Sequence, residues 1–216
     1  MHRSEGQLVL SATDLSSFFE CEYRTILDLE VLGGRLERPP QNDLERRILQ
    51  ERGREHEARV LNEFVRQGLG VVNVPEEVAA GTGSDAGSVT LAAMTRGADL
   101  IYQGTLQYDG WEGRPDFLQR AACPDGVASR FGDYLYEPVD AKLAREEKAR
   151  AVLQLCAYAD LLLGLQGLLP QRMWLALGTQ ELVLQPLKTT DHAAFQPSEA
   201  EYSCVCGKRP ATDFLP

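Results

Sequence analysis

Two short motifs place carboxylates and a lysine where they could act together on a phosphodiester bond. The first, Gly-Arg-Pro-Asp, ends at Asp116, and the second, Asp-Ala-Lys, runs from Asp140 to Lys142. Two neighbouring carboxylates repel each other unless a cation lies between them, and hard oxygen ligands suit Mg²⁺ or Mn²⁺. Such an ion would activate a water molecule, and Lys142 would orient that water or neutralise the transition state. Asp116, Asp140 and Lys142 are therefore the candidate catalytic residues.

The spacing within the second motif suits a strand, which we expect over 134–143. Side chains alternate along a strand, so Asp140 and Lys142 would point to one face and Ala141 to the other. Asp116 would lie on a neighbouring hairpin strand, where it could face the same point. Taken alone, an Asp-x-Lys pattern is commonplace and is more often a surface ion pair than a site.

A histidine lies on a strongly charged helix that we expect over 43–67. Val60 and Phe64 follow His56 by four and eight positions, which places the histidine near the buried side of that helix. Two interpretations stay open: a third metal ligand, which would shift the preference from Mg²⁺ towards Mn²⁺, or a core histidine with a backbone partner. Glu57 is one position further round the helix and is expected to point elsewhere, although a short rotation could make it a ligand.

Two polar side chains share one face of the helix that we expect over 146–167. Gln154 and Tyr158 are four positions apart, and this helix directly follows the strand that carries Asp140. They could hold a phosphate or position Lys142. The alternative is an ordinary pair on a helix surface.

The order of the predicted elements indicates an α/β fold, with a mixed central sheet flanked by helices. The long helix after the Asp140 strand is expected to be a crossover connection. Asp109-Gly110 is a strong hairpin signal between two strands. We predict helices over 11–33, 43–67 and 146–167, a helical turn over 89–95, a loop over 79–88, and strands over 69–74, 99–108, 112–120, 134–143, 173–177 and 181–187.

Length and charge restrict the function without fixing it. The chain has 216 residues, enough for one sizeable core, and a net charge of −10. That charge argues against a protein that coats nucleic acid non-specifically, but a nuclease stays compatible because positive charge can be local. Basic residues do cluster, although solvated helix faces are an equal alternative: Arg46, Arg47, Arg52 and Arg54 before His56, and Arg145, Lys148 and Arg150 after Lys142.

The cysteines and the apolar runs predict a cytoplasmic protein that does not enter a membrane. Five cysteines is an odd number, and their irregular spacing is not typical of a disulfide framework. No apolar run reaches the roughly 18 to 20 residues that span a bilayer. The first residues do not form a secretory signal.

The whole series of motifs resembles that of the RecB-type nucleases in the PD-(D/E)XK superfamily. It is most similar to the CRISPR-associated RecB-type exonucleases and to the nuclease part of RecB-like nuclease–helicase fusions. The resemblance covers about 11–187 and implies a restriction-endonuclease-like core, with a nuclease domain over 1–188 and a truncated or disordered tail over 189–216. The segments that carry it are 53–56, 104–106, 113–116, 140–142 and 154–161.

The resemblance implies a Mg²⁺- or Mn²⁺-dependent DNA nuclease, an exonuclease on single strands or ends rather than a site-specific endonuclease. It would hydrolyse phosphodiester bonds with a metal-activated water, alongside a helicase or a CRISPR or repair partner chain. It implies metal ligands at His56, Asp116, Asp140 and the carbonyl of Ala141, and makes Lys142 catalytic. It gives Gln154 and Tyr158 a role in binding DNA or ordering the site.

The chain departs from the family pattern in two respects. Many relatives bind a 4Fe–4S cluster through one early cysteine and three near the C-terminus. Cys21 matches the first, but only Cys204 and Cys206 lie near the end, and such a cluster usually needs four thiolates. The ligand set is incomplete, so zinc or no metal are the alternatives. The chain also lacks the Gly-x-x-x-x-Gly-Lys-Ser/Thr loop of a helicase.

Two rival functions come from other classes. One is a catalytically inactive nuclease-fold module that acts as a binding subunit in a DNA repair or CRISPR-adaptation assembly. The other is a metal-free α/β interaction domain in which the motifs are coincidental. A separation of more than roughly 8 Å between Asp116 and Asp140 would favour the latter, since a shared hard cation holds its oxygen ligands at about 2 to 2.6 Å.

Overall fold

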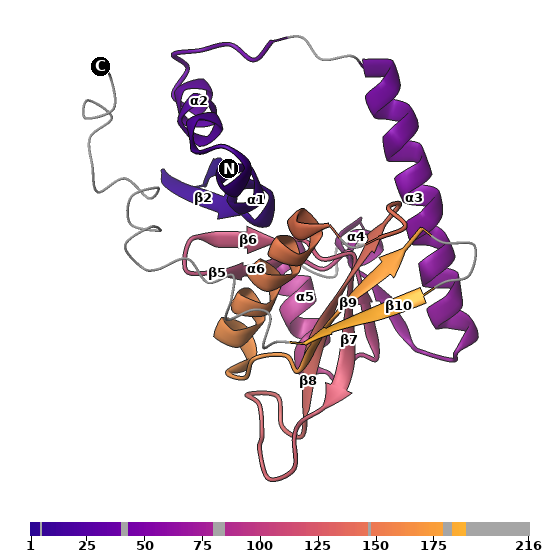
Figure 1. Cartoon of the computed structure of the whole chain (residues 1–216). Helices are drawn as coiled ribbons and strands as arrows, with labels where there is room; N and C mark the ends of the chain where they lie inside the picture. Colours follow the sequence, from indigo (N-terminus) through magenta and orange to yellow (C-terminus); the bar gives the residue numbers. More distant parts are fainter. Residues whose placement is uncertain (5, 40–42, 80–84, 147, 179–182, 189–216) are drawn as a thin grey trace.

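The computed structural model describes residues 1–4, 6–39, 43–79, 85–146, 148–178 and 183–188. These residues form a mixed α/β fold with two mixed sheets, a larger central one and a smaller one, flanked by helices (Figure 1). The predicted α/β class, with a mixed central sheet between helices, is confirmed at this level. The predicted tail over 189–216, with Cys204 and Cys206, lies outside the described residues.

The central sheet has six strands in the order β10-β9-β8-β7-β4-β3. β3 pairs with β4 and β8 with β9 in parallel, and the other neighbours are antiparallel. β8 is the longest strand, and six consecutive residues of it are buried because helices cover both faces. The strands are β3 (Val71–Asn73), β4 (Leu100–Tyr102), β7 (Phe117–Ala122), β8 (Tyr134–Lys142), β9 (Arg172–Leu177) and β10 (Val183–Lys188).

The connection from β8 to β9 is the predicted helical crossover. Helix α6 (Ala149–Gln166) follows β8, and β9 then pairs with β8 in parallel. The helix ends at Gly167, whose φ of 76° is the left-handed conformation that glycine adopts without a Cβ clash. Leu155 and Leu162 of α6 are fully buried in a core with Leu118, Tyr136 and Leu175 of the sheet, which we call the α6-side core.

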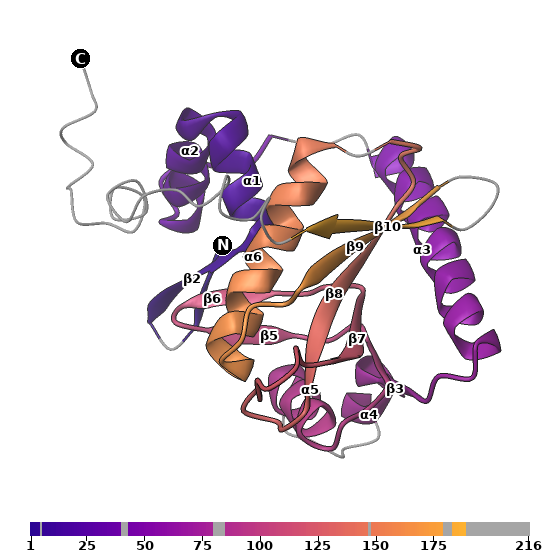
Figure 2. The same cartoon turned by 60° about the horizontal axis from the view of Figure 1, so that its bottom comes forward.

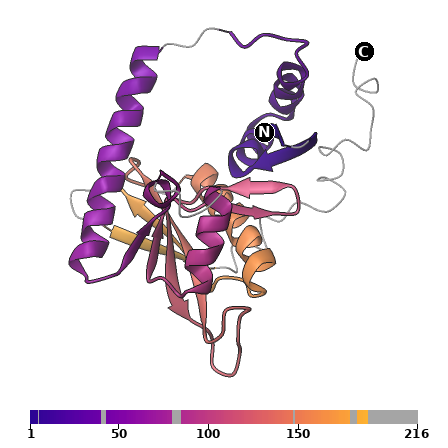
Figure 3. The same cartoon turned by 180° about the vertical axis from the view of Figure 1, so that it is seen from behind.

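Helix α3 (Asp43–Arg66) covers the opposite face of the central sheet (Figures 2 and 3). Its Val60 and Phe64 pack against Phe117, Val139 and Ala176, and these residues form the α3-side core. The bounds agree with the predicted helix over 43–67. Its first turns extend past the sheet, and apolar side chains there stay exposed: Leu44, Ile48 and Leu49.

A smaller sheet has the order β1-β2-β6-β5. The predicted hairpin at Asp109-Gly110 is confirmed, with positive φ at both residues and β5 paired antiparallel with β6. The two long strands predicted around it are each divided, because the chain passes from one sheet to the other at 103–105 and at 114–116. The strands are β1 (His2–Ser4), β2 (Gln7–Ser11), β5 (Leu106–Tyr108) and β6 (Trp111–Gly113), of which β1 and β2 were not predicted.

The remaining helices differ in detail from the prediction. The first begins after the capping box of Ser11 and Asp14, as expected, but Cys21 has an extended backbone that divides it into α1 (Ala12–Glu20) and α2 (Glu22–Leu32). Part of the loop predicted over 79–88 and the helical turn after it form α5 (Ala86–Thr95), and α4 (Val74–Ala79) precedes it. Within the described residues, no helix has the length and apolar character to cross a membrane.

Candidate active site

The two acidic motifs meet at one end of strands β7 and β8. The antiparallel register pairs Phe117 with Val139, so Asp116 lies just before β7 and Asp140 follows Val139 on the neighbouring strand. The backbone N–H of Ala141 donates a hydrogen bond of 2.7 Å to Oδ2 of Asp116. The Asp116 carboxylate thus contacts the backbone of the residue that directly follows Asp140. The condition that would have favoured coincidental motifs is therefore not met.

Asp140 and Lys142 share one face of β8, as predicted. Val139 and Ala141 face the α3-side core, so Asp140 and Lys142 point towards α6. Asp140 is only 2% exposed, and the ammonium nitrogen of Lys142 lies 2.5 Å from its Oδ2. This contact is an ion pair without hydrogen-bond geometry, since Oδ2 is a buried oxygen with no hydrogen-bond partner among the described residues.

The charges of the site act strongly on one another. Burial raises the pKa of Asp116 well above its usual value, and the charges of Asp140 and Glu57 raise it further, while the N–H of Ala141 opposes them. Burial lowers the pKa of Lys142, but the charge and contact of Asp140 and the charge of Asp116 outweigh burial and raise it. The site therefore concentrates negative charge around one ammonium group, which stays protonated at neutral pH.

The segment that carries Asp116 is fixed by helix α6. A Cβ atom at Gly113 would lie 2.6 Å from Leu161 Cδ1 and 2.8 Å from Tyr158 Cδ1, so only glycine allows this approach. The hydroxyl of Tyr158 donates to the carbonyl oxygen of Arg114 at 3.3 Å. Burial raises the pKa of Tyr158 well above its usual value, followed by the charges of Asp140 and Asp116. The phenol stays neutral and orders the segment.

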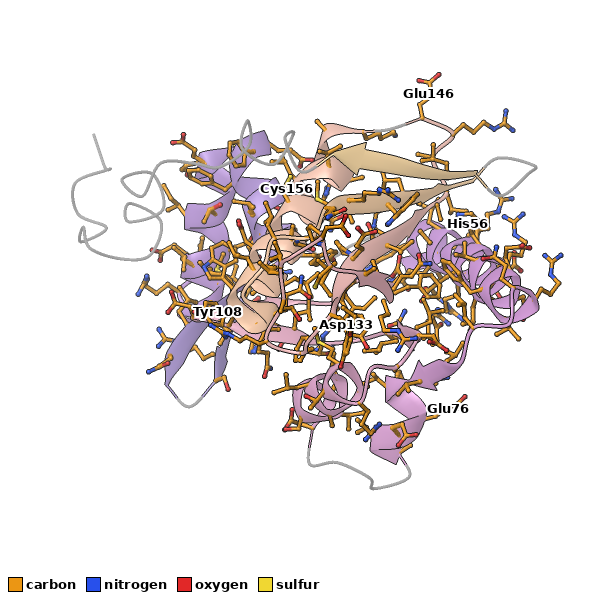
Figure 4. The ribbon with its side chains drawn as sticks, turned by 90° about the horizontal axis from the view of Figure 1, so that it is seen from below. His56, Glu76, Tyr108, Asp133, Glu146 and Cys156 are labelled. Carbon is orange, nitrogen blue, oxygen red and sulfur yellow. The ribbon has the colours of Figure 1, made fainter. Side chains whose placement is uncertain are left out.

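His56 lies on α3, where it faces the central sheet (Figure 4). It is buried and approaches β9 from the α3 side, where its Nε2 lies 2.9 Å from the carbonyl oxygen of Ala176. Its Nδ1 lies 3.1 Å from Nη2 of Arg59, and because arginine only donates, Nδ1 accepts and Nε2 carries the proton. Both nitrogens thus have partners, which agrees with the core interpretation, and the metal-ligand interpretation of His56 stays a prediction.

Glu57 lies next to the site, and the expectation that it points elsewhere was wrong. Its carboxylate accepts a hydrogen bond from Gln103 and acts on Asp116 by its charge. Burial, followed by the charge of Glu57, also raises the pKa of Tyr102 to about 12. The spacing of Glu57 from Val60 and Phe64, three and seven positions, was the signal that could have revealed this, because it too is that of a buried helical stripe.

Gln154 lies beside Lys142, at a cavity of about 280 Å³ that both residues line. Its side-chain amide donates to Oγ1 of Thr13, at the start of α1, over 3.4 Å. The structure thus brings Gln154, Tyr158 and Lys142 together around the first turns of α6. Of the alternatives for Gln154 and Tyr158, an unconnected surface pair does not describe this arrangement.

The cysteines within the described residues lie apart in the fold. Cys21 is exposed between α1 and α2, whereas Cys156 is buried on α6 (Figure 4). Cys123 is half-buried on the loop after β7, with its Sγ 3.7 Å from the carbonyl oxygen of Gly132. The expected iron–sulfur ligands Cys204 and Cys206 fall outside this part of the chain. The cluster therefore stays a prediction.

The donors at the site suit a hard divalent ion better than a structural zinc ion. In the described part of the chain, no group of three or more His, Cys, Asp or Glu side chains is arranged to hold a metal. Mg²⁺, however, commonly takes one or two carboxylates and keeps several waters. Asp116 and Asp140 supply two carboxylates, and Oδ2 of Asp140, which accepts no hydrogen bond within the described residues, is an oxygen ligand that a divalent ion would satisfy. The residues present therefore fit such an ion.

Comparison with models of known protein families found no match to this chain, and comparison with curated proteins found none either. The chemistry of the site, the order of the motifs and the elements that position them are therefore what indicate a function.

Proposed function

We propose that this chain is a Mg²⁺- or Mn²⁺-dependent DNA nuclease with a restriction-endonuclease-like core of the RecB-like PD-(D/E)XK type. The observation that carries the proposal is the meeting of Asp116 and Asp140 across β7 and β8, beside Lys142. Two separate motifs bring buried carboxylates to one point although their charges oppose it. A binding site for a cation explains why a fold would keep this arrangement.

Asp116 and Asp140 would hold the divalent ion, with the carbonyl of Ala141 as a further ligand. Glu57 is the residue of α3 whose charge acts on Asp116, so Glu57 rather than His56 is the candidate for a further ligand. An all-oxygen donor set accepts Mg²⁺ as well as Mn²⁺, so the preference for Mn²⁺ that a histidine would bring no longer applies. When bound, the ion supplies Lewis-acid activation of water and offsets charge on the phosphate.

Lys142 acts as a fixed positive charge. Because its pKa is raised, its ammonium group is protonated at neutral pH and is not a general base in the metal-free site. It can donate hydrogen bonds to a phosphate oxygen whose charge grows during the reaction, which stabilises the transition state. Tyr158 holds the Asp116 segment through the Arg114 carbonyl. Gln154 lines the cavity beside Lys142, where it can contact the bound DNA strand.

The proposal is tested by substitution of Lys142. We expect Lys142→Ala to lower the cleavage rate of labelled single-stranded DNA in Mn²⁺ by about 10²- to 10³-fold, the loss typical of one transition-state donor. Calorimetric titration should still detect Mn²⁺ binding, since both carboxylates remain. Arg24→Gln is the control, because this exposed arginine forms an ion pair with Glu20 on the first two helices and does not line the site.

Two results would contradict the proposal in different ways. Equal cleavage by the wild type and Lys142→Ala would refute the assigned mechanism. A wild-type protein that neither binds Mn²⁺ nor cleaves DNA would instead favour the alternative of an inactive nuclease-fold module that serves as a binding subunit.

A further inference from the structure

The cavity that Lys142 and Gln154 line extends away from Asp116 and Asp140. It lies between the turn after β8, the first turns of α6 and the end of β9, and has a volume of about 280 Å³. Lys142 lines it on the side of Asp140. Lys148 and Arg150 line it at the start of α6, and Glu146 lies on the turn between β8 and α6 (Figure 4). No step assigned above to the catalytic site uses Lys148, Arg150 or Glu146.

The charges around this cavity suit a dianion. Among the described residues that line it, the cationic side chains are Lys142, Lys148 and Arg150, and the acidic one is Glu146. Lys142 is already paired with Asp140, which leaves Lys148 and Arg150 for an anion. Arg150 also approaches Glu20 at 3.4 Å, but this pair is nearly half-exposed and therefore weak. A phosphate monoester carries about −1.5 to −2 charges at neutral pH, whereas a phosphodiester carries one. The two positive charges of Lys148 and Arg150 thus match a terminal phosphate better than an internal one.

The size and the walls of the cavity suit a single nucleotide. Its volume of about 280 Å³ is just below the range typical of small-ligand sites, about 300 to 1,000 Å³. The cavity therefore does not accommodate an extended oligonucleotide. Leu175 and Leu177 provide an apolar wall for a sugar or a base. The start of α6 adds positive potential, since no side chain caps it and its first turn contains no acid.

We infer that this cavity binds the terminal phosphate monoester of a DNA strand, through Lys148 and Arg150, with the end nucleotide next to Lys142. The inference rests on the proposed nuclease function and makes it more specific: the substrate is a phosphorylated strand end. Whether the phosphate is on the 5′ or the 3′ end is decided by the substrates of the test.

The first arm of the test measures cleavage of one single-stranded oligonucleotide with a 5′-phosphate, a 3′-phosphate or only hydroxyl ends. We expect wild-type kcat/KM to be about tenfold or more higher for one phosphorylated form, as loss of a charge-assisted contact implies. The double variant Lys148→Gln/Arg150→Gln should lose this preference. Arg24→Gln, which removes another arginine paired with Glu20 but outside the cavity, should keep it.

The second arm measures binding without catalysis. Calorimetry with deoxyadenosine 5′-monophosphate and its 3′ isomer, in the presence of a chelator, should show binding to the wild type and at least tenfold weaker binding to the double variant. Both substituted side chains are exposed, and thermal unfolding checks that the variant is folded.

The outcomes separate this inference from the proposed function. A protein that cleaves all three substrates equally and binds neither nucleotide overturns the inference and leaves the nuclease intact. A protein that binds a nucleotide through Lys148 and Arg150 but cleaves no DNA supports the cavity and overturns the nuclease.

Discussion

At the scale of single residues, the carboxyl group of Asp116 lowers the stability of the metal-free fold while it supplies a proposed metal ligand. Burial, Asp140 and Glu57 raise its pKa above the value in the unfolded chain. A group whose pKa is raised on folding stabilises the protein fully below its unfolded pKa, and this contribution is lost as pH rises through the folded pKa. Above the unfolded pKa and without metal, Asp116 therefore lowers the stability of the fold, and a bound divalent ion would offset this loss.

We therefore expect Asp116→Asn to stabilise the metal-free protein at neutral pH while it weakens metal binding. The amide oxygen can still accept from Ala141, and the buried charge is gone. Each unit of raised pKa corresponds to about 1.4 kcal/mol, and each kcal/mol to about 2 to 4 °C in Tm for a chain of this size. Thermal unfolding across pH should show the advantage shrinking as pH falls through the folded pKa.

Mn²⁺ provides the decisive comparison for this variant. The ion should raise the Tm of the wild type, since it binds the folded state, and should leave Asp116→Asn nearly unchanged. Asp125→Asn, which removes an exposed carboxylate on the loop after β7, should respond to Mn²⁺ like the wild type. Equal stabilisation of Asp116→Asn and the wild type by Mn²⁺ would place the metal elsewhere.

At the scale of elements, the site depends on how closely β6 approaches α6. Gly113 ends β6 and lies against Tyr158 and Leu161, so the helix determines where the following residues run. Asp116 then begins the return to the central sheet, immediately before β7. The position of one carboxylate is therefore set by the contact between a helix and a strand of the smaller sheet.

Substitution of Gly113 by alanine should disturb this contact. The added methyl group would lie within 3 Å of the side chains of Leu161 and Tyr158. Such overpacking typically costs about 1 to 3 kcal/mol. We expect a lower Tm and weaker Mn²⁺ binding, because the segment that carries Asp116 must shift. Calorimetry and thermal unfolding measure the two effects.

Gly53→Ala is the matched control, with the opposite expected sign. Gly53 lies within α3, and a Cβ atom there meets nothing within 4 Å. Alanine should stabilise the helix by about 0.5 to 1 kcal/mol and leave Mn²⁺ affinity unchanged. If Gly113→Ala behaved like Gly53→Ala, α6 would not fix the position of Asp116.

At the scale of the whole molecule, a net charge of −10 means that DNA binding must rely on local positive charge. The cations that border the site are Lys142, Lys148 and Arg150. The arginines in the first turns of α3 are interleaved with acids, so that surface has little net charge. The contact with a strand should therefore involve few phosphates.

We expect a shallow salt dependence of single-strand binding. With two or three phosphates neutralised, log Kobs should fall with log salt concentration at a slope of about −1.4 to −2.1. Fluorescence anisotropy with Asp116→Asn measures this without cleavage. A slope several times steeper would indicate an extended basic track outside the site, contrary to the arrangement described here.

Much of the local structure was predictable from the sequence. The capping box of Ser11 and Asp14, the Asp109-Gly110 hairpin and the crossover helix after β8 all follow from side-chain chemistry within a few residues. The alternation that sets Asp140 and Lys142 on one face is a property of any strand. These features depend on short-range interactions, so they can be inferred without knowing the partners of each element.

Only the tertiary structure decided which elements meet. The strands predicted around Asp109-Gly110 divide between two sheets, and this division brings Asp116 next to Asp140. His56 and Glu57 both fit the buried stripe of α3, yet one contacts β9 and the other lies beside Asp116. Periodicity reports that a side chain is buried, whereas its partner depends on pairing between distant segments, which no local pattern encodes.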